Sequence, residues 1–497
     1  MRLLYKNISA NFLSNAWSTL LLLLLTPVYI HFLGLESYGL IGFYLSWVAI
    51  CGIIDTGISA TLTRELAWLS ARPNEAIRIP NLLFTLEIIY WGIILILSLA
   101  FLSAAWWLGS EWFRSSEISP EIVRDVLMLM ALSLAVQIPS GLYVGGLMGL
   151  QRQIECAGFL AFFGTIRGLG AVLILWIISS DIRSFILWQI LVYTVQTGVL
   201  RWFLWKSIGM ERNPLSFSKK ELSLSKSFIT NISIVTALSL LISQADKIIM
   251  SKILPLKEFG FYMLAWTLAG GISKISMPII QAAAPSFTNL ISREDSKALV
   301  LQFRIICQLM STLVLPPTML IVFFSKKILF TWTGNPDIAA EASPILAILV
   351  MGMALCASSY PAASILYGKN RIKEIIIFNL VALLILIPMW VSIIPSYGVI
   401  GFAVSWMLYG LGLYSISQFY GIEELVGIKF MMCVFKDFIA PCLTSFFVAF
   451  SAIYFINSAE GKFAVILLLL LYMIIGWFFA LFVCKDLKNL LIRKSKC

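Results

Sequence analysis

Seven charged side chains fall inside long apolar stretches of this 497-residue chain. A charge within hydrocarbon is costly unless it faces a wet interior or an opposite charge, so such residues are functional candidates. Basic members could bind an anionic group such as a phosphate, and acidic members could bind a proton or a cation. The seven are Asp55, Arg64, Glu87, Arg167, Asp246, Lys247 and Lys274.

Arg167 is the strongest of the basic candidates, because it lies near the middle of its apolar stretch among several glycines. Together with Lys247 and Lys274 it could give a cavity a cationic wall that suits a phosphate-bearing ligand. Arg64 is a further cavity candidate. Two simpler interpretations stay open: Lys247 can extend to the membrane interface, and Arg64 can pair with Glu65 as an interfacial anchor.

The acidic candidates are Asp55, Glu87 and Asp246. They could bind a coupling ion, or they could pair with the basic residues. The residue types alone do not decide between these roles.

The composition predicts the elements that position these residues. The chain is 60% hydrophobic and 12% charged, against about 25% charged in soluble domains. Apolar blocks of the length that crosses a bilayer predict an all-α polytopic membrane protein with about fourteen transmembrane helices. These are expected near 12–33, 37–60, 80–108, 122–149, 154–178, 184–207, 227–251, 257–284, 300–325, 342–367, 373–394, 397–420, 437–457 and 463–484.

The net charge of +11 follows from topology and does not indicate a nucleic-acid partner. The connections on the side that holds the N-terminus carry about three times as many Lys and Arg residues as those on the other side, which places both termini in the cytoplasm.

Internal echoes predict a duplication. FLGLESYG from Phe32 resembles ILPLKEFG from Ile253, and a second weak match has nearly the same displacement. We therefore expect two six-helix bundles related as parallel repeats, with two additional C-terminal helices. The expected parts are 1–208, a cytoplasmic linker at 209–226, 227–421, and 422–497. A longer match, SYGLIGFYLSW from Ser37 and SYGVIGFAVSW from Ser396, is interpreted as a shared way of re-entering the bilayer from the outer side.

Sequence motifs argue against catalysis. The chain has no GxxxxGK[ST], GxSxG or HExxH motif, and its eight cysteines have no metal-type spacing. We therefore expect no catalytic residues, metal or cofactor. The outer connections also are short for an enzyme that builds polysaccharide.

The whole pattern resembles the Wzx-type O-antigen flippases, of the polysaccharide transport family in the superfamily that includes the MATE exporters and the lipid II flippase. The residues that carry the resemblance are NISANFLSNAWSTLLLLLLTPVYIHFLGLESYGL near the N-terminus and QADKIIMSK around Asp246 and Lys247. The resemblance covers most of the chain, but its motifs are diffuse.

This resemblance implies a bacterial inner-membrane flippase for an undecaprenyl-diphosphate-linked oligosaccharide, working by alternating access and coupled to an ion gradient. Its partners would be the lipid bilayer, the lipid-linked glycan, and a polysaccharide polymerase and chain-length regulator. Two alternatives are a MATE-like exporter of cationic drugs, which favours acidic cavity residues, and a polysaccharide polymerase or ligase.

Overall fold

A computed structural model gives the structure of the chain. It describes residues 2–72, 74–209, 216–219, 237–238, 240–369, 371–419 and 434–494, and within these ranges the regular structure is helical throughout. The chain divides into two compact units, Met1–Gly260 and Phe261–Cys497.

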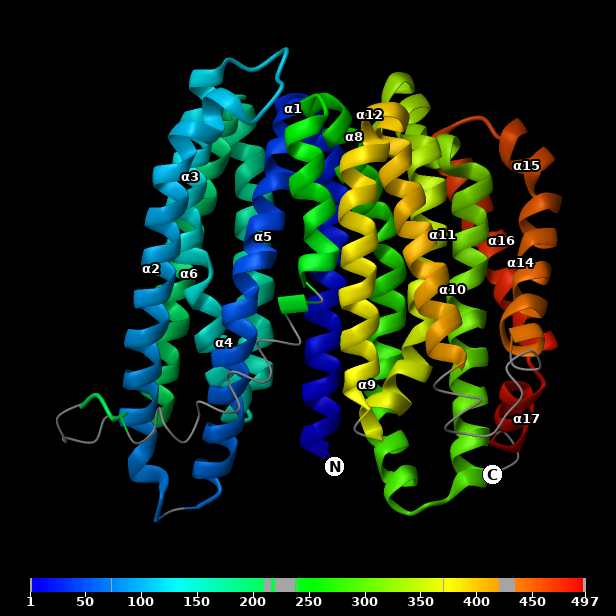
Figure 1. The fold of residues 1–497 in the computed structure, drawn as a ribbon, viewed down its shortest axis with the longest axis horizontal. Coiled ribbons are helices and arrows are strands. Elements are labelled where there is room, and N and C mark those ends of the chain that lie inside the picture. The colour runs from blue at the N-terminus through cyan, green and yellow to red at the C-terminus, as the bar shows by residue number, and fades with distance from the viewer. Residues whose placement is uncertain are drawn as a thin grey trace. The chain divides into compact units, whose positions relative to one another are not determined.

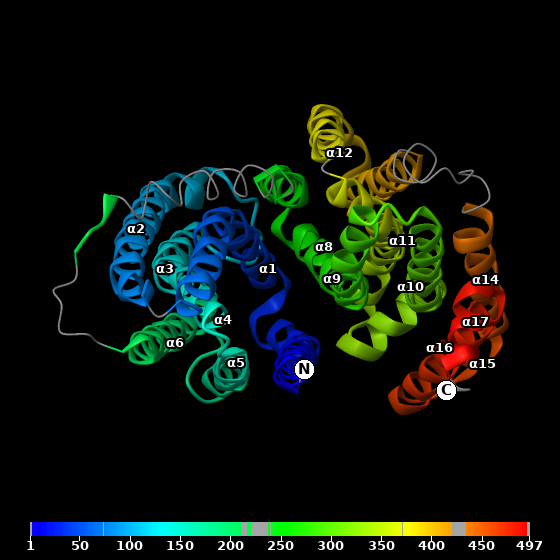
Figure 2. The ribbon, with the colours of Figure 1, turned by 90° about the horizontal axis from the view of Figure 1, so that it is seen from below.

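Unit 1 contains six labelled α-helices and a further helical segment at 240–253 (Figure 1). Figure 2 views the helices of this unit along their length. Their bounds are α1 (Arg2–Ser70), α2 (Ile79–Glu111), α3 (Pro120–Gln137), α4 (Pro139–Gly149), α5 (Gln153–Ile177) and α6 (Ile182–Ile208), with a short 3₁₀ turn η1 (Ala76–Arg78) before α2.

Helix α8 (Leu256–Ala269) begins in unit 1 and continues into unit 2. The other described helices of unit 2 are α9 (Gly271–Ser292), α10 (Ser296–Thr333), α11 (Pro336–Gly368), α12 (Ile372–Gln418), a π-helical turn η3 (Val434–Ile439), α14 (Ala440–Ser451), α15 (Ile453–Ser458), α16 (Lys462–Val483) and α17 (Lys485–Lys494).

The predicted all-α polytopic class is confirmed. Eleven stretches of the described residues are long and apolar enough to cross a membrane. One of them, Asn11–Gly52, takes in the first predicted span and most of the second, whereas α6 corresponds to the predicted span at 184–207 but is not among the eleven. The first half of the predicted span at 227–251 lies outside the described residues, apart from 237–238.

Two glycines bend the longest helices near the boundary between two predicted spans. Within α1, Gly34 has φ 79° and ψ 168°, and within α12, Gly398 has φ 55° and ψ −146°. Positive φ is strained for residues with a Cβ, so glycine at these positions permits the sharp change of direction. One helical element thereby carries two successive apolar spans.

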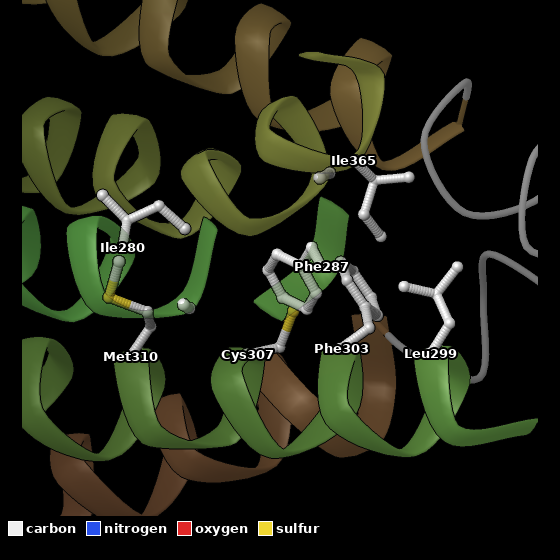
Figure 3. Packing of buried hydrophobic residues seen from close by; sticks show 9 residues of the cluster. Ile280, Phe287, Leu299, Phe303, Cys307, Met310 and Ile365 are labelled. Carbon is white, nitrogen blue, oxygen red and sulfur yellow. The ribbon is translucent and has the colours of Figure 1, made fainter. Parts of the chain in front are cut away.

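Part of the apolar core of unit 2 lies among α9, α10 and α11. Figure 3 shows Phe287 of α9, Phe303 and Cys307 of α10, and Ile365 of α11 in this cluster. Phe287, Phe303 and Ile365 are fully buried. The cluster fixes α10 against α9 and α11, and α10 also carries Gln308 and Ser311, two of the buried polar side chains described below for unit 2.

The two echoed segments, 32–39 and 253–260, touch each other within unit 1. A Cβ at Gly39 would lie 2.8 Å from the carbonyl oxygen of Leu256, and a Cβ at Gly260 would lie 2.5 Å from that of Leu35. The contact is reciprocal, because Leu256 and Gly260 follow Leu35 and Gly39 at the displacement of the echo. Only glycine allows the two backbones to approach this closely.

The connection between α2 and α3 is hydrogen-bonded to both echoed segments. Its Ser115, Ser116 and Glu117 donate hydrogen bonds to the carboxylate of Glu36, which lies just beyond the bend of α1. These include the backbone N–H groups of Ser116 and Glu117, each at 3.0 Å. The carbonyl oxygen of Arg114 accepts a 2.8 Å bond from the N–H of Leu256. One carboxylate thus helps to hold the connection beside the reciprocal glycine contact.

We predict that Gly39→Ala and Gly260→Ala each destabilise the protein by about 1–3 kcal/mol, because the added methyl group meets a backbone carbonyl that cannot move freely. Thermal unfolding of the detergent-purified protein measures the effect. Gly92→Ala and Gly198→Ala are matched controls, since a Cβ at either position meets nothing within 4 Å, and alanine favours a helix by roughly 1 kcal/mol over glycine. Equal midpoints for all four variants would contradict the interpretation.

Candidate functional site

Glu87 of α2 lies in a network of neutral and charged donors within unit 1. Its side chain is buried, and it accepts hydrogen bonds from Arg201 and Trp205 of α6 and from Tyr143 of α4, the last at 2.6 Å. The Tyr143 hydroxyl in turn accepts a 2.9 Å bond from Trp91. Glu87 therefore pairs with Arg201, which is not one of the seven charges singled out above.

Asp55 of α1 lies in a different polar contact. Tyr90 donates to its Oδ1 at 2.7 Å, and Ser59, one turn further along α1, donates at 2.5 Å. A Cβ at Gly141 of α4 would collide with this carboxylate, so the glycine makes room for it. Among the described residues, no basic side chain forms an ion pair with Asp55.

Arg167 of α5 lies between polar and aromatic side chains of α6. Its Nη1 donates to Oε1 of Gln196 at 3.1 Å, and its Cζ lies 4.4 Å from the ring centroid of Tyr193. Gln196 is buried, and Arg167 is partly buried. Tyr29 of α1 lies nearby, since its hydroxyl donates to the carbonyl oxygen of the next residue, Gly168, at 3.0 Å.

The charge of Arg167 lacks a carboxylate partner within the described part of the chain. Gln196 is its only hydrogen-bond acceptor there, so four of the five guanidinium N–H donors remain available. An arginine placed in an apolar span without a counter-ion is suited to bind an anionic ligand.

Lys247 and Asp246 form a buried ion pair in the segment 240–253. Nζ of Lys247 lies 3.1 Å from Oδ1 of Asp246, and the two side chains are 2% and 0% exposed. The same ammonium group donates to the carbonyl oxygen of Ser243 at 2.6 Å. This accounts for a lysine inside an apolar stretch by local neutralisation, and a contact with substrate stays a prediction.

The other two basic candidates are exposed. Arg64 is exposed on α1 and pairs with its neighbour Glu65, as the anchor interpretation expects. Lys274 is an exposed residue of α9 in unit 2. Within unit 1, the structure does not bring Arg167 and Lys247 into a described contact.

A second buried ion pair, which the sequence interpretation did not select, lies in unit 2. Asp437 of η3 is 3% exposed and accepts bonds from Nε and Nη2 of Arg304 of α10, both at 3.3 Å. Gln308, one turn along α10, donates to Asp437 at 2.8 Å and to Asp486 of α17 at 3.0 Å. The network attaches the C-terminal helices to α10.

Comparison with known families identifies the chain. The family described as "Polysaccharide biosynthesis protein" matches residues 4–291. The chain belongs to this family. The MatE family also matches residues 232–391, and a search of curated proteins returned no match.

Several solved structures share the fold of this chain. "Lipid II flippase MurJ, inward closed conformation" is 14% identical, with 99% of each chain covered and a TM-score of 0.69. A mutant of the Vibrio cholerae MATE transporter VcmN is 11% identical, covering 87% of this chain and 99% of its own, with a TM-score of 0.61. A MATE in complex with MaL6 is 11% identical, covering 85% and 96%, with a TM-score of 0.60. This protein is therefore a multi-pass membrane protein that shares the fold of these solved structures.

In this polysaccharide biosynthesis protein, two important basic residues escaped the sequence interpretation because they lie near helix ends. Arg201 was assigned to the cytoplasmic side by the charge pattern, and Arg304 likewise. The available signal was an acidic residue in an apolar stretch, which requires a partner somewhere: Glu87 for Arg201, and Asp437 for Arg304.

We predict that Arg201→Ala destabilises the protein more than Glu87→Gln does. Removing the arginine leaves a buried carboxylate without a counter-charge, which typically costs about 3–5 kcal/mol, whereas the arginine left by Glu87→Gln is 53% exposed and can be hydrated. The double variant should recover part of the stability that Arg201→Ala loses. Thermal unfolding at neutral pH measures all three, and simple additivity of the two losses would argue against the network.

Proposed function

We propose that the protein is a flippase that moves an undecaprenyl-diphosphate-linked oligosaccharide, an O-antigen or related repeat unit, from the cytoplasmic to the periplasmic leaflet of a bacterial inner membrane. Family membership supports the link to polysaccharide. The observation that carries the proposal is Arg167, a partly buried charge in an apolar span with four available donors. Its natural ligand is the diphosphate.

The surroundings of Arg167 suit the rest of such a substrate. Tyr193 stacks beneath the guanidinium, and Gln196 fixes its orientation. Tyr29, which is partly buried beside Gly168, adds aromatic surface that can contact the apolar faces of sugars. While Arg167 holds the charged diphosphate, the polyprenyl chain would stay in the bilayer, because its transfer from hydrocarbon into water is unfavourable.

Alternating access fits the reciprocal glycine contact. An opening on the outer side would have to separate residues 35–39 from 256–260, which now touch through Gly39 and Gly260. Backbone contacts of this kind close tightly. The ion pair beside them, Lys257 with Glu117, is exposed and therefore costs little to break. We propose that they close the outer side while substrate enters from the cytoplasm, and that Asp55, Lys274 and the Asp246–Lys247 pair respond to the coupling ion or the substrate.

We predict that Arg167→Ala lowers surface polysaccharide at least tenfold in a strain that lacks its own flippase for the same repeat unit, because charge-assisted hydrogen bonds contribute about 1.5–3 kcal/mol each. Arg167→Lys should retain part of the activity, since it keeps the charge but loses the planar fork.

Electrophoresis of extracted polysaccharide, beside immunoblots of the protein, measures this outcome. Arg183→Ala is the matched control. Arg183 lies at the start of α6, ten residues before Tyr193, and it is neutralised by Asp125 and Asp181. Full polysaccharide from Arg167→Ala at normal protein abundance would refute the role of Arg167. Failure of the unaltered chain to restore any repeat unit tested would refute the function.

The second candidate function is export of cationic compounds, favoured by Asp55, a partly buried carboxylate without an ion-pair partner among the described residues. The two functions predict opposite sensitivities. An exporter would confer resistance to cationic dyes that Asp55→Asn abolishes and Arg167→Ala leaves intact. A flippase would confer no resistance, which a growth assay in an efflux-deficient strain decides.

A further inference from the structure

A small cavity in unit 2 adjoins the buried ion pair at Asp437. It has room for roughly one water-sized ligand, and residues of α10, α11, α12 and η3 line it. Among them are Ser311, Ser358, Gln418 and Asp437. All four are less than 9% exposed, so buried side chains form its polar lining.

The protons of the two serines are already committed. Ser311 donates to the carbonyl oxygen of Asp437 at 2.6 Å, and Ser358 donates to that of Ala354 at 2.8 Å. A hydroxyl group has one proton and two lone pairs, so each serine presents only lone pairs to a further ligand.

Gln418 reinforces this polarity. Its Nε2 donates to the carbonyl oxygen of Ser358 at 3.3 Å, which fixes the orientation of the amide. No donor in the described part of the chain bonds its side-chain oxygen, although the residue is only 3% exposed. An amide oxygen at a cavity without a donor can accept a ligand that supplies positive charge or a proton.

The charged groups beside the cavity sum to a negative charge. Asp437 and Asp486 share the single guanidinium of Arg304, at 3.3 Å and 3.0 Å, which leaves one net negative charge in the network. Both amide protons of Gln308 are used by these two carboxylates. Oδ2 of Asp437 accepts only the bond from Nε of Arg304 within the described residues, so one of its lone pairs remains.

We propose that this cavity binds a monovalent metal cation. The lining offers hard oxygen acceptors of the hydroxyl, amide and carboxylate types, which alkali-metal cations share with the other hard cations. One net negative charge balances one positive charge. A divalent ion is disfavoured, because the described residues contain no group of three acidic, histidine or cysteine side chains that could hold a metal ion. An anion would meet acceptors alone.

The cation would join parts of unit 2 that the sequence separates. Gln418 ends α12, Ser311 lies on α10, and Asp437 lies on η3, which leads into α14. Binding would therefore stabilise the attachment of the C-terminal helices to α10 and α12. This inference does not depend on the transported substrate, and it goes beyond the proposed flippase activity.

The test is the thermal unfolding of the full-length, detergent-purified protein in NaCl, KCl or N-methyl-D-glucamine chloride at constant ionic strength. We expect a saturable rise of the midpoint by a few degrees with sodium or potassium relative to the organic cation, since a ligand that binds the folded state stabilises it. Saturable binding of radioactive sodium or rubidium should give the same half-saturation concentration.

Variants distinguish this cavity from other sites. Gln418→Leu should abolish the cation-dependent shift, and Ser358→Ala should raise the half-saturation concentration severalfold. Ser445→Ala is the matched control, because Ser445 is equally buried and donates to the carbonyl oxygen of Pro441, four residues earlier, but does not line the cavity. Equal midpoints in all three salts, or an unchanged shift in both Gln418→Leu and Ser358→Ala, would overturn the proposal.

Discussion

The free-energy cost of leaving a charge uncompensated in hydrocarbon governs where this chain can place its ionisable residues. Glu87, Asp437 and Lys247 are buried, and each has an opposite charge beside it. Such pairs do not by themselves make a protein more stable than apolar packing would, because desolvation offsets much of the attraction. They do make the loss of one partner expensive, and so they restrict which helices can lie beside one another.

Arg167 stands out against that background. Its neighbours Gln196 and Tyr193 orient the guanidinium without cancelling its charge. Full neutralisation by a carboxylate would stabilise the resting protein and would compete with the diphosphate of the proposed substrate. Neutral, polarisable neighbours instead keep the side chain in place while its donors stay available, which is the arrangement expected of a site that must both bind and release an anion.

The sequence predicted the elements far better than the pairings. Apolar blocks of span length identified the helices, because the bilayer fixes that length. The same periodic signal placed Glu87 within a helix but could not find Arg201, since 114 positions separate them. They meet only because α2 and α6 both pack against α3 and α4. Gly34 shows a similar limit: the sequence placed the end of a span there, but its positive φ depends on the local geometry of α1. Buried partners near span ends look like ordinary interfacial charges until the fold is known.

The glycine of the SYG stretch has a separate role in each copy. Gly398 has a positive φ and bends its own helix, and a Cβ there would meet nothing within 4 Å. Gly39 lies within α1 without such a bend and packs against the backbone of Leu256. The Gly39–Leu256 and Gly260–Leu35 contacts together have the form of an isologous interface, in which residue i of one partner meets residue j of the other and the reverse. In a dimer of identical half-length chains, one glycine position and one leucine position would form both contacts, so one substitution would alter both. In the duplication that the sequence predicts, fusion into one polypeptide would free the two positions to diverge separately, and this contact could then become asymmetric.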